Sequence, residues 1–371
     1  MKTFFNLIQE VQKPGFCHRC GGCVTFCTAV NYGALKIDAD GNPGYADIEK
    51  CIECGLCYAI CPEIDELEEE TRRLVSWSAP LGRVFETTVA RAADPDIRNQ
   101  GTDGGVVTAL LAHLFDAGRI DGAIVTRQIS SFQREPFLAT TRDEILNSAG
   151  FHFDTSHGMK DFSDRYLTYS SIEELRPVLR KGLRRVAFVG TPCQIKSIRK
   201  MQAMEIVPSE AIATCFGLFC SGNYLFGAEQ RESIARMGGF SWDHVVKINV
   251  KDDFLVHLQD GSMVSIELNK LESMKRVACR YCPDYAAEFA DISFGGVGAE
   301  HGWTTVLTRS PLGRAVLAEA REGAVEDFSW KDNARFATQA FERVLHWSEE
   351  KKKTAQANRQ ELGGTEVRIK A

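Results

Sequence analysis

Eight of the thirteen cysteines in this 371-residue chain lie between residues 17 and 61, in two copies of one spacing. Each copy reads C-x2-C-x2-C-x3-C. The two copies consist of Cys17, Cys20, Cys23 and Cys27, and of Cys51, Cys54, Cys57 and Cys61. Thiolates at this spacing are the usual ligands of 4Fe-4S clusters, so the sequence predicts two clusters in this stretch.

The spacing also predicts that the two copies exchange their last ligands. Three thiolates at steps of three residues surround one face of a cluster, whereas the fourth leaves on a helix and points to the other cluster. We therefore expect one cluster on Cys17, Cys20, Cys23 and Cys61, and the other on Cys51, Cys54, Cys57 and Cys27. Residues 1–75 are predicted to fold as a bacterial-type two-cluster 4Fe-4S ferredoxin domain.

Two other uses of these cysteines fit the spacing less well. Paired C-x2-C motifs also bind Zn²⁺, but zinc takes four ligands in two pairs and leaves the third and fourth cysteines of each run without a use. A disulfide framework is typical of small secreted domains, and this chain has no recognisable secretory signal and is long enough for a large core.

Length and charge limit the remaining possibilities. A chain of 371 residues is expected to form two or three domains. Its net charge of -6 argues against nucleic acid as the main partner. No apolar run approaches the length of a membrane span, so we expect no direct membrane insertion, and intact clusters favour a reducing cytoplasm.

Residues 80–330 alternate between expected strands and helices, which predicts an α/β (α+β) core. Within it, the glycine-rich loop Asn99–Gly105 precedes an apolar helix that begins at Val106. A loop at a helix N-terminus presents free backbone N–H groups to a phosphate or pyrophosphate, although a simple cap and tight turn is the alternative. Residues 331–371 are predicted to form a charged helix or tail, either solvated or docked on a partner.

Five cysteines lie outside the two runs, and four of them would complete a third cluster. Cys193 follows an expected buried strand and lies at the N-terminus of a helix, where we expect a lowered thiol pKa and a nucleophile or metal ligand. Cys279 and Cys282 form a further C-x2-C pair.

The remaining two cysteines, Cys215 and Cys220, lie five residues apart on one expected strand and so face opposite sides. We expect Cys220, at the strand end, to be a ligand and Cys215 to be a core residue. The alternative is that Cys193 and Cys220 are only buried thiols.

Between residues 83 and 309 the chain resembles the beta subunits of coenzyme F420-reducing hydrogenase, F420-dependent formate dehydrogenase and F420H2 dehydrogenase. The motifs that carry this resemblance are Asp103-Gly104-Gly105-Val106-Val107-Thr108, Gly190-Thr191-Pro192-Cys193-Gln194, Cys220 with Asn223, Cys279-x2-Cys282-x-Asp284-Tyr285, Ala290-Asp291-Ile292-Ser293 and Gly302-Trp303-Thr304-Thr305-Val306. With its ferredoxin domain, the chain looks most like the F420H2 dehydrogenase input subunit.

The resemblance implies a flavoprotein core that binds FAD, a 4Fe-4S cluster beside the flavin, and a hydride-transfer pocket for coenzyme F420. Residue by residue, it implies that Cys193, Cys220, Cys279 and Cys282 hold this third cluster. It further implies a flavin site formed by Gly101, Thr102, Asp103, Gly104, Gly105 and Val106, with the Gly295–Gly298 stretch, Gly298 included, and Trp303 nearby.

The expected function follows from what each cofactor carries. F420 exchanges only hydride and a cluster exchanges single electrons, so FAD, which does both, belongs between them. We expect electrons to pass through three clusters to or from a partner of the hydrogenase, formate dehydrogenase, heterodisulfide reductase or membrane dehydrogenase type. No nucleophilic catalytic set is required. The alternatives are an electron-transfer subunit without flavin, and a ferredoxin-fed reductase of a tetrapyrrole or other conjugated compound. Because the hydride site is expected to lie wholly in the core, residues 1–75 should be removable without loss of the flavin site.

Overall fold

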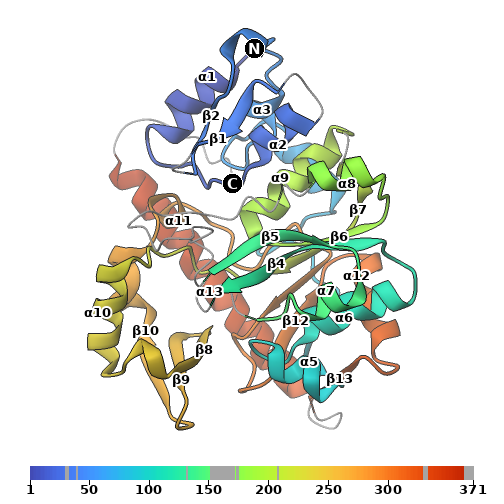
Figure 1. Cartoon of the computed structure of the whole chain (residues 1–371), viewed down its shortest axis with the longest axis vertical. Helices are drawn as coiled ribbons and strands as arrows, with labels where there is room; N and C mark the ends of the chain where they lie inside the picture. Colours follow the sequence, from blue (N-terminus) through green and yellow to red (C-terminus); the bar gives the residue numbers. More distant parts are fainter. Residues whose placement is uncertain are drawn as a thin grey trace.

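The computed structural model describes residues 1–29, 33–38, 41–130, 133–150, 172, 175–206, 209–328 and 333–362. It is a mixed α/β structure with a large sheet and a small cysteine-rich module at one end (Figure 1). The elements of that module are α1 (Phe4–Leu7), the π-helix η1 (Ile8–Gln12), α2 (Gly22–Ala29), β1 (Leu35–Ile37), β2 (Pro43–Tyr45), η2 (Ile48–Lys50), α3 (Leu56–Ala59) and α4 (Glu68–Leu74).

The large sheet has eight strands in the order β13-β3-β12-β11-β7-β6-β4-β5. The strands are β3 (Glu86–Ala92), β4 (Gly122–Ser130), β5 (Gln133–Ala139), β6 (Val186–Gly190), β7 (Ile212–Leu218), β11 (Ile292–Gly295), β12 (Thr304–Thr308) and β13 (Val325–Asp327). The central strands β11, β7, β6 and β4 are parallel to one another, whereas the strands on both flanks pair antiparallel. The mixed sheet therefore has a parallel centre, as the alternating pattern predicts.

Helices cover both faces of this sheet. One face packs against α5 (Pro95–Gln100), α6 (Val106–Asp116), α7 (Arg142–Leu146) and α12 (Pro311–Ala320). The other packs against α8 (Leu175–Lys181), α9 (Pro192–Ala203) and the cysteine-rich module. Because side chains alternate along a strand, Phe216 packs in the first layer and its neighbour Cys215 in the second.

Local sequence signals set where the helices of the first layer begin. Asp94 accepts hydrogen bonds from the backbone at the start of α5, and Pro95 occupies the first helical position. Thr141 and Glu144 form a capping box at the start of α7. Ser310 Oγ accepts a hydrogen bond from Gly313 N at the start of α12.

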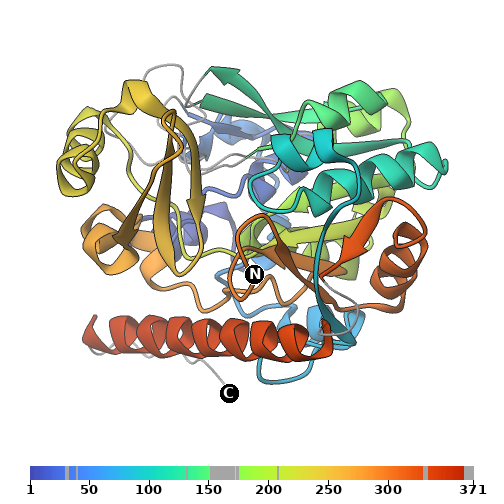
Figure 2. The same ribbon diagram turned by 90° about the horizontal axis from the view of Figure 1, so that it is seen from below.

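A second, three-stranded sheet lies beside the large one (Figure 2). It belongs to a segment with its own hydrophobic cluster, which includes Phe226, Phe254 and Leu271. Its elements are α10 (Ala228–Gly238), η6 (Trp242–His244), β8 (Val245–Val250), β9 (Asp253–Leu258), β10 (Met263–Glu267) and η7 (Leu268–Met274). Two short helices lie outside this segment. The helix η5 (Ser209–Ala211) precedes β7 of the large sheet, and α11 (Val277–Arg280) follows the small sheet.

The long helix α13 (Asn333–Glu361) runs along one side of the molecule (Figure 2). Its Ala340 and Val344 are fully buried, and its Arg359 reaches the cysteine-rich module, where Nη2 donates to Glu63 Oε2 at 2.6 Å. One side of the expected charged helix is thus part of the folded structure. Among the described residues, no helix is both long and apolar enough to cross a membrane.

The cysteine-rich module is joined to the core by a buried lysine on α9. The Lys200 ammonium is fully buried and donates to the carbonyl oxygens of Cys61 at 2.8 Å, Glu66 at 3.0 Å and Ile64. Cys20, Phe26 and Ile60 of the module belong to the same hydrophobic cluster as residues of the sheet and α9. The structure therefore differs from the expected separability, because removing residues 1–75 would expose this shared core.

We predict that Lys200→Met lowers the free energy of unfolding by about 3 kcal/mol, because it removes a buried ammonium that donates to three carbonyl oxygens of the module. Anaerobic urea unfolding followed by tryptophan fluorescence measures the change. Lys196→Met, one turn earlier on α9, is the matched control, since it removes only a partly exposed ion pair with Glu68 and should cost less than about 1 kcal/mol. Equal losses in the two variants would contradict the proposed role of Lys200 in joining the module to the core.

Candidate functional site

The eight cysteines of the N-terminal module form two groups that mix the two copies. Cys61 of the second copy lies within electrostatic range of Cys20 and Cys17 of the first. Conversely, Cys27 of the first copy lies near Cys51 and Cys54 of the second. This is the grouping that crossed ligation requires.

Among the described residues, no three His, Cys, Asp or Glu side chains converge as the ligands of one metal ion would.

The core brings together the other four expected ligands. Cys193, the second residue of α9, lies near Cys282, which in turn lies near Cys279. Cys220, just beyond β7, is also a neighbour of Cys279. Cys215 is not part of this group, because it is fully buried in the layer between the sheet and α9.

Buried cations surround the core thiols. Arg276 Nη2 lies 3.6 Å from Cys279 Sγ, and its Nε and Nη1 have no hydrogen-bond partner among the described residues. Lys351 of α13 donates to the carbonyl oxygens of Cys220 at 2.6 Å and Asp284 at 2.9 Å. Buried positive charge with free N–H groups fits an anionic cluster held by four thiolates.

The pKa values of the core thiols shift in different directions. Burial alone would raise the pKa of Cys279, but Arg276 and His18 lower it to about 5. For Cys193 the expected lowering is wrong: burial, with Cys20 and Cys282 nearby, raises its pKa well above the usual value. Desolvation outweighs the positive end of α9 at this thiol.

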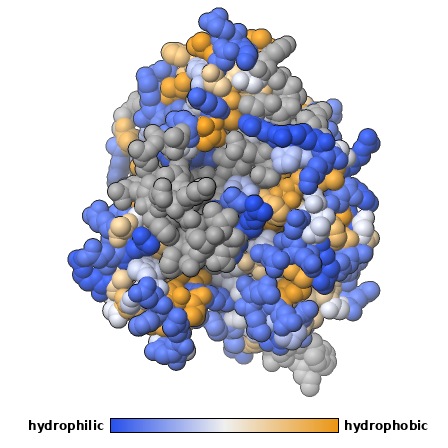
Figure 3. Space-filling view, in the orientation of Figure 1, coloured by the Kyte–Doolittle hydropathy of each residue, from blue (hydrophilic) through white to orange (hydrophobic). Residues whose placement is uncertain are grey.

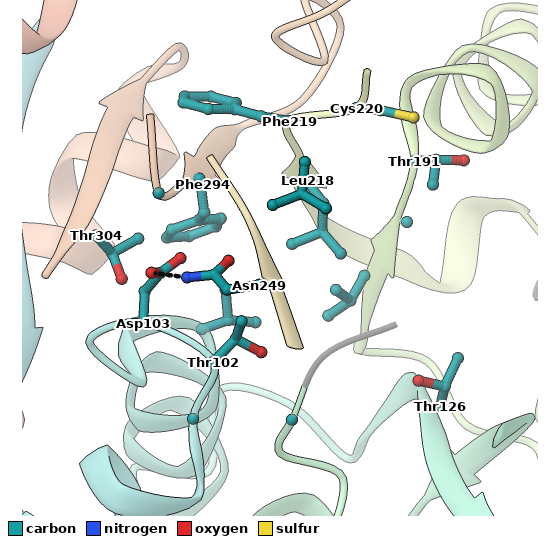
Figure 4. Close-up of a pocket in the computed structure, with 18 of the residues that line it drawn as sticks. Thr102, Asp103, Thr126, Thr191, Leu218, Phe219, Cys220, Asn249, Phe294 and Thr304 are labelled. Atoms are coloured by element: carbon teal, nitrogen blue, oxygen red, sulfur yellow. Dashed lines mark hydrogen bonds between the residues drawn. The ribbon is translucent and has the colours of Figure 1, made fainter. Parts of the chain in front are cut away.

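A cavity of about 260 Å³ opens at the carboxyl ends of the parallel strands (Figure 4). Gly190 and Thr191 line it from the end of β6, Leu218 to Cys220 from the end of β7, and Gly295 from the end of β11. Parallel strands finish at one edge of a sheet, which is where α/β proteins bind ligands. Cys220 therefore belongs both to the core thiol group and to the cavity wall.

The glycine-rich loop forms the opposite wall. Gly105 has a φ of +71° and precedes α6 without a side-chain cap, and a Cβ here would lie 2.8 Å from the carbonyl oxygen of Ile97. Only glycine suits this position, and no side chain among the described residues caps the first N–H groups of α6. The loop therefore fits a phosphate group.

Asp103 in this loop is tied to the smaller sheet. Its Oδ1 accepts a hydrogen bond from Asn249 Nδ2 at 2.6 Å, as Figure 4 shows, and lies 3.5 Å from Lys251 Nζ. Gly104 N donates to Thr304 Oγ1 at 3.0 Å. The loop is thus held from both the large and the small sheet.

Not every residue expected at the flavin site lines the cavity. Gly101, Thr102, Asp103, Gly105 and Val106 do. Gly104 instead packs against the β3 residues Ala90 and Arg91, Gly298 packs against Ala340 of α13, and Trp303 packs against Phe328.

Sequence reasoning missed several residues of the cavity wall. Asn249 comes from a segment that is distant in the sequence, and no local pattern marks it. Tyr285 belongs to the motif that follows Cys282, but it was not expected in the cavity wall. Phe219 could have been found, because it lies between the end of β7 and Cys220.

Comparison with known protein families gives three matches. Residues 87–161 match the family described as coenzyme F420 hydrogenase/dehydrogenase, beta subunit N-term, and residues 183–332 match the corresponding C terminus. Residues 9–62 match the 4Fe-4S dicluster domain.

Individual proteins show the same similarity. The coenzyme F420 hydrogenase subunit beta of Methanothermobacter thermautotrophicus is 29% identical over 76% of this chain and 98% of its own length. A subunit of the F(420)H(2) dehydrogenase of Methanosarcina mazei is 28% identical over 85% of each chain. A chain of the F420-reducing [NiFe] hydrogenase complex from Methanosarcina barkeri superposes with a TM-score of 0.65 and 27% identity, over 77% of this chain and 94% of that one.

The grouping of the N-terminal thiols predicts how paired cysteine variants lose iron. Cys27→Ser with Cys54→Ser should remove one cluster, about four irons, because both thiols serve the same group. Cys27→Ser with Cys23→Ser should remove both clusters, about eight irons. Iron analysis of anaerobically purified protein measures both, and the reverse order of losses would show that each copy holds its own cluster.

Proposed function

Because this chain belongs to the coenzyme F420 hydrogenase/dehydrogenase beta subunit family, we propose that it transfers hydride between coenzyme F420 and FAD. We further propose that it passes single electrons through three 4Fe-4S clusters to or from a partner redox subunit. The observation that carries the proposal is the position of Cys220, which faces the cavity and also belongs to the core thiol group. A flavin in this cavity would lie directly beside the cluster that these thiols would hold.

The chain supplies a suitable site for the phosphate groups of FAD. The uncapped N-terminus of α6 and the loop residues Gly101 to Gly105 would receive them. Asn249 donates to the Asp103 carboxylate and Lys251 forms an ion pair with it, so both residues hold this part of the loop to the smaller sheet. FAD, when bound, exchanges a hydride with F420 and single electrons with a cluster.

The rest of the wall would receive the flavin ring. Leu218, Phe219 and Phe294 give the cavity an apolar surface beside the thiol Cys220, as seen in Figure 4. Apolar walls exclude water from a reduced flavin and limit its side reactions.

The thiol groups lie in an order that suits electron transfer between the cavity and the surface. Cys193 of the core group is a neighbour of Cys20 in the first N-terminal group. Cys23 of that group is a neighbour of Cys57 in the second. Three groups in sequence would let each cluster pass electrons to the next.

The second N-terminal thiol group, to which Cys51 belongs, lies close to exposed apolar side chains. Ile48 and Ile52, on either side of Cys51, are 60% and 59% exposed. Figure 3 shows hydrophobic residues among hydrophilic ones at this end of the molecule. We propose that electrons enter or leave here, in the reducing cytoplasm, through a subunit of the hydrogenase, formate dehydrogenase, heterodisulfide reductase or membrane dehydrogenase type.

The substrate is tested by anaerobic mixing. Protein whose acid-released flavin is FAD should lose its flavin absorbance on addition of reduced F420, and NADH or NADPH should have no effect. Protein without flavin would indicate a pure electron-transfer subunit. Flavin that only reduced ferredoxin can bleach would indicate a reductase of another conjugated compound.

The core cluster is tested by two cysteine variants. Wild-type protein should hold about twelve irons, and Cys282→Ser about eight, with the flavin still reduced by F420 but no longer passing electrons to the N-terminal clusters. Cys215→Ser, the control from the hydrophobic layer, should keep all of its iron. Equal iron loss in both variants would contradict the assigned ligand set.

A further inference from the structure

Arg276 carries a positive charge into the interior of the protein. The residue is 4% exposed, and its Nη2 lies 3.6 Å from Cys279 Sγ. Among the described residues, its Nε and Nη1 have no hydrogen-bond partner, and no carboxylate forms an ion pair with its guanidinium. An arginine side chain is not deprotonated in proteins, so this buried charge persists.

Other buried cations of the protein have oxygen acceptors. Arg199 donates to the Asp291 carboxylate at 2.8 Å. Lys200 and Arg309 each donate to several backbone carbonyl oxygens. Burying a cation costs free energy unless acceptors or an anion compensate it. Arg276 therefore fits an anionic group bound beside it.

Backbone hydrogen bonds fix Arg276 next to the core thiol group. Arg276 N donates to the carbonyl oxygen of Asn223 at 2.7 Å, and Cys279 N donates to the carbonyl oxygen of Arg276 at 2.9 Å. Asn223 N also donates to Cys279 Sγ at 3.3 Å. Arg276 immediately precedes α11, which contains Cys279. The same short segment therefore supplies both the thiol and the cation beside it.

The segment that contains Arg276 also contacts the N-terminal module. A Cβ on Gly15 would lie 3.0 Å from Val277 Cγ1, so the chain before Cys17 packs directly on the residue after Arg276. The guanidinium is within electrostatic range of Cys17 in the first N-terminal group and of Cys193 in the core group. It thus lies near both of the thiol groups between which electrons would pass.

We propose that Arg276 donates its free N–H groups to sulfur atoms of the core cluster and thereby raises the reduction potential of that cluster. The inference rests on the proposed function, since it takes the core thiols to be cluster ligands. Reduction adds one negative charge to a cluster, and a fixed cation that donates hydrogen bonds to sulfur stabilises this charge. The less negative potential makes the cluster a better acceptor of electrons from the cavity.

A redox titration followed by electron paramagnetic resonance tests the proposal on the full chain. The core signal is identified as the one that Cys282→Ser removes. Arg276→Met should move the midpoint potential of that signal to a more negative value, because it removes both the charge and the donors. Arg276→Lys keeps the charge but loses the planar group with its five N–H donors, and should shift the potential less.

Arg280→Met is the matched control. Arg280 lies on the same short helix and carries the same charge, but its Nη2 donates to the carbonyl oxygens of Glu272 at 3.2 Å and Ser273 at 3.4 Å. This variant should shift the core potential much less than Arg276→Met does. A shift of equal size would show a general effect of net charge and would overturn the role assigned to Arg276.

The remaining outcomes separate this inference from the proposed function. Full iron content with an unchanged core potential in Arg276→Met would overturn the inference alone, with water as the acceptor of the free N–H groups. Wild-type protein with about eight irons and no third signal would overturn the proposed function and this inference with it. If Arg276→Met does not fold or loses the core cluster, pulsed resonance of wild-type protein labelled with ¹⁵N-arginine should show a nitrogen coupling in the core signal. The absence of that coupling would also overturn the inference.

Discussion

The parallel centre of the large sheet determines where the chemistry of this protein can occur. β6 and β7 are neighbours and run in the same direction, so Cys193 and Cys220, which follow them, emerge at one edge. The glycine-rich loop before α6 approaches the same edge, and the smaller sheet holds it there through Asn249. An antiparallel pair at this place would have sent the two cysteines to opposite ends of the sheet.

Buried charge joins the separate parts of the chain. Lys200 connects α9 to the N-terminal module, and Glu63 connects that module to α13 through Arg359. Burying such groups is costly unless every charge has partners. Each of these side chains therefore favours one arrangement of the module on the core. Any other arrangement would leave a buried charge without its partners.

Sequence reasoning succeeded where a pattern is local. The cysteine runs, the loop before Val106 and the buried position of Cys215 follow from spacing or strand alternation. It failed where tertiary contacts determine the property. The position of Cys193 at a helix N-terminus predicts a lowered thiol pKa, yet burial raises this pKa. Nor does any local signal show that Lys200, on a helix rich in lysine and arginine, is buried, or that His18 in a cysteine run pairs with the buried Glu63.

Helix α13 has a consequence for how the protein is assembled. It donates to the backbone carbonyls of Cys220, Arg280, Tyr281 and Asp284, and so covers one side of the core thiol group. Because α13 follows every other described element in the chain, it is also synthesised after them. Helix α13 therefore closes this side of the core thiol group only after every other described element has been made.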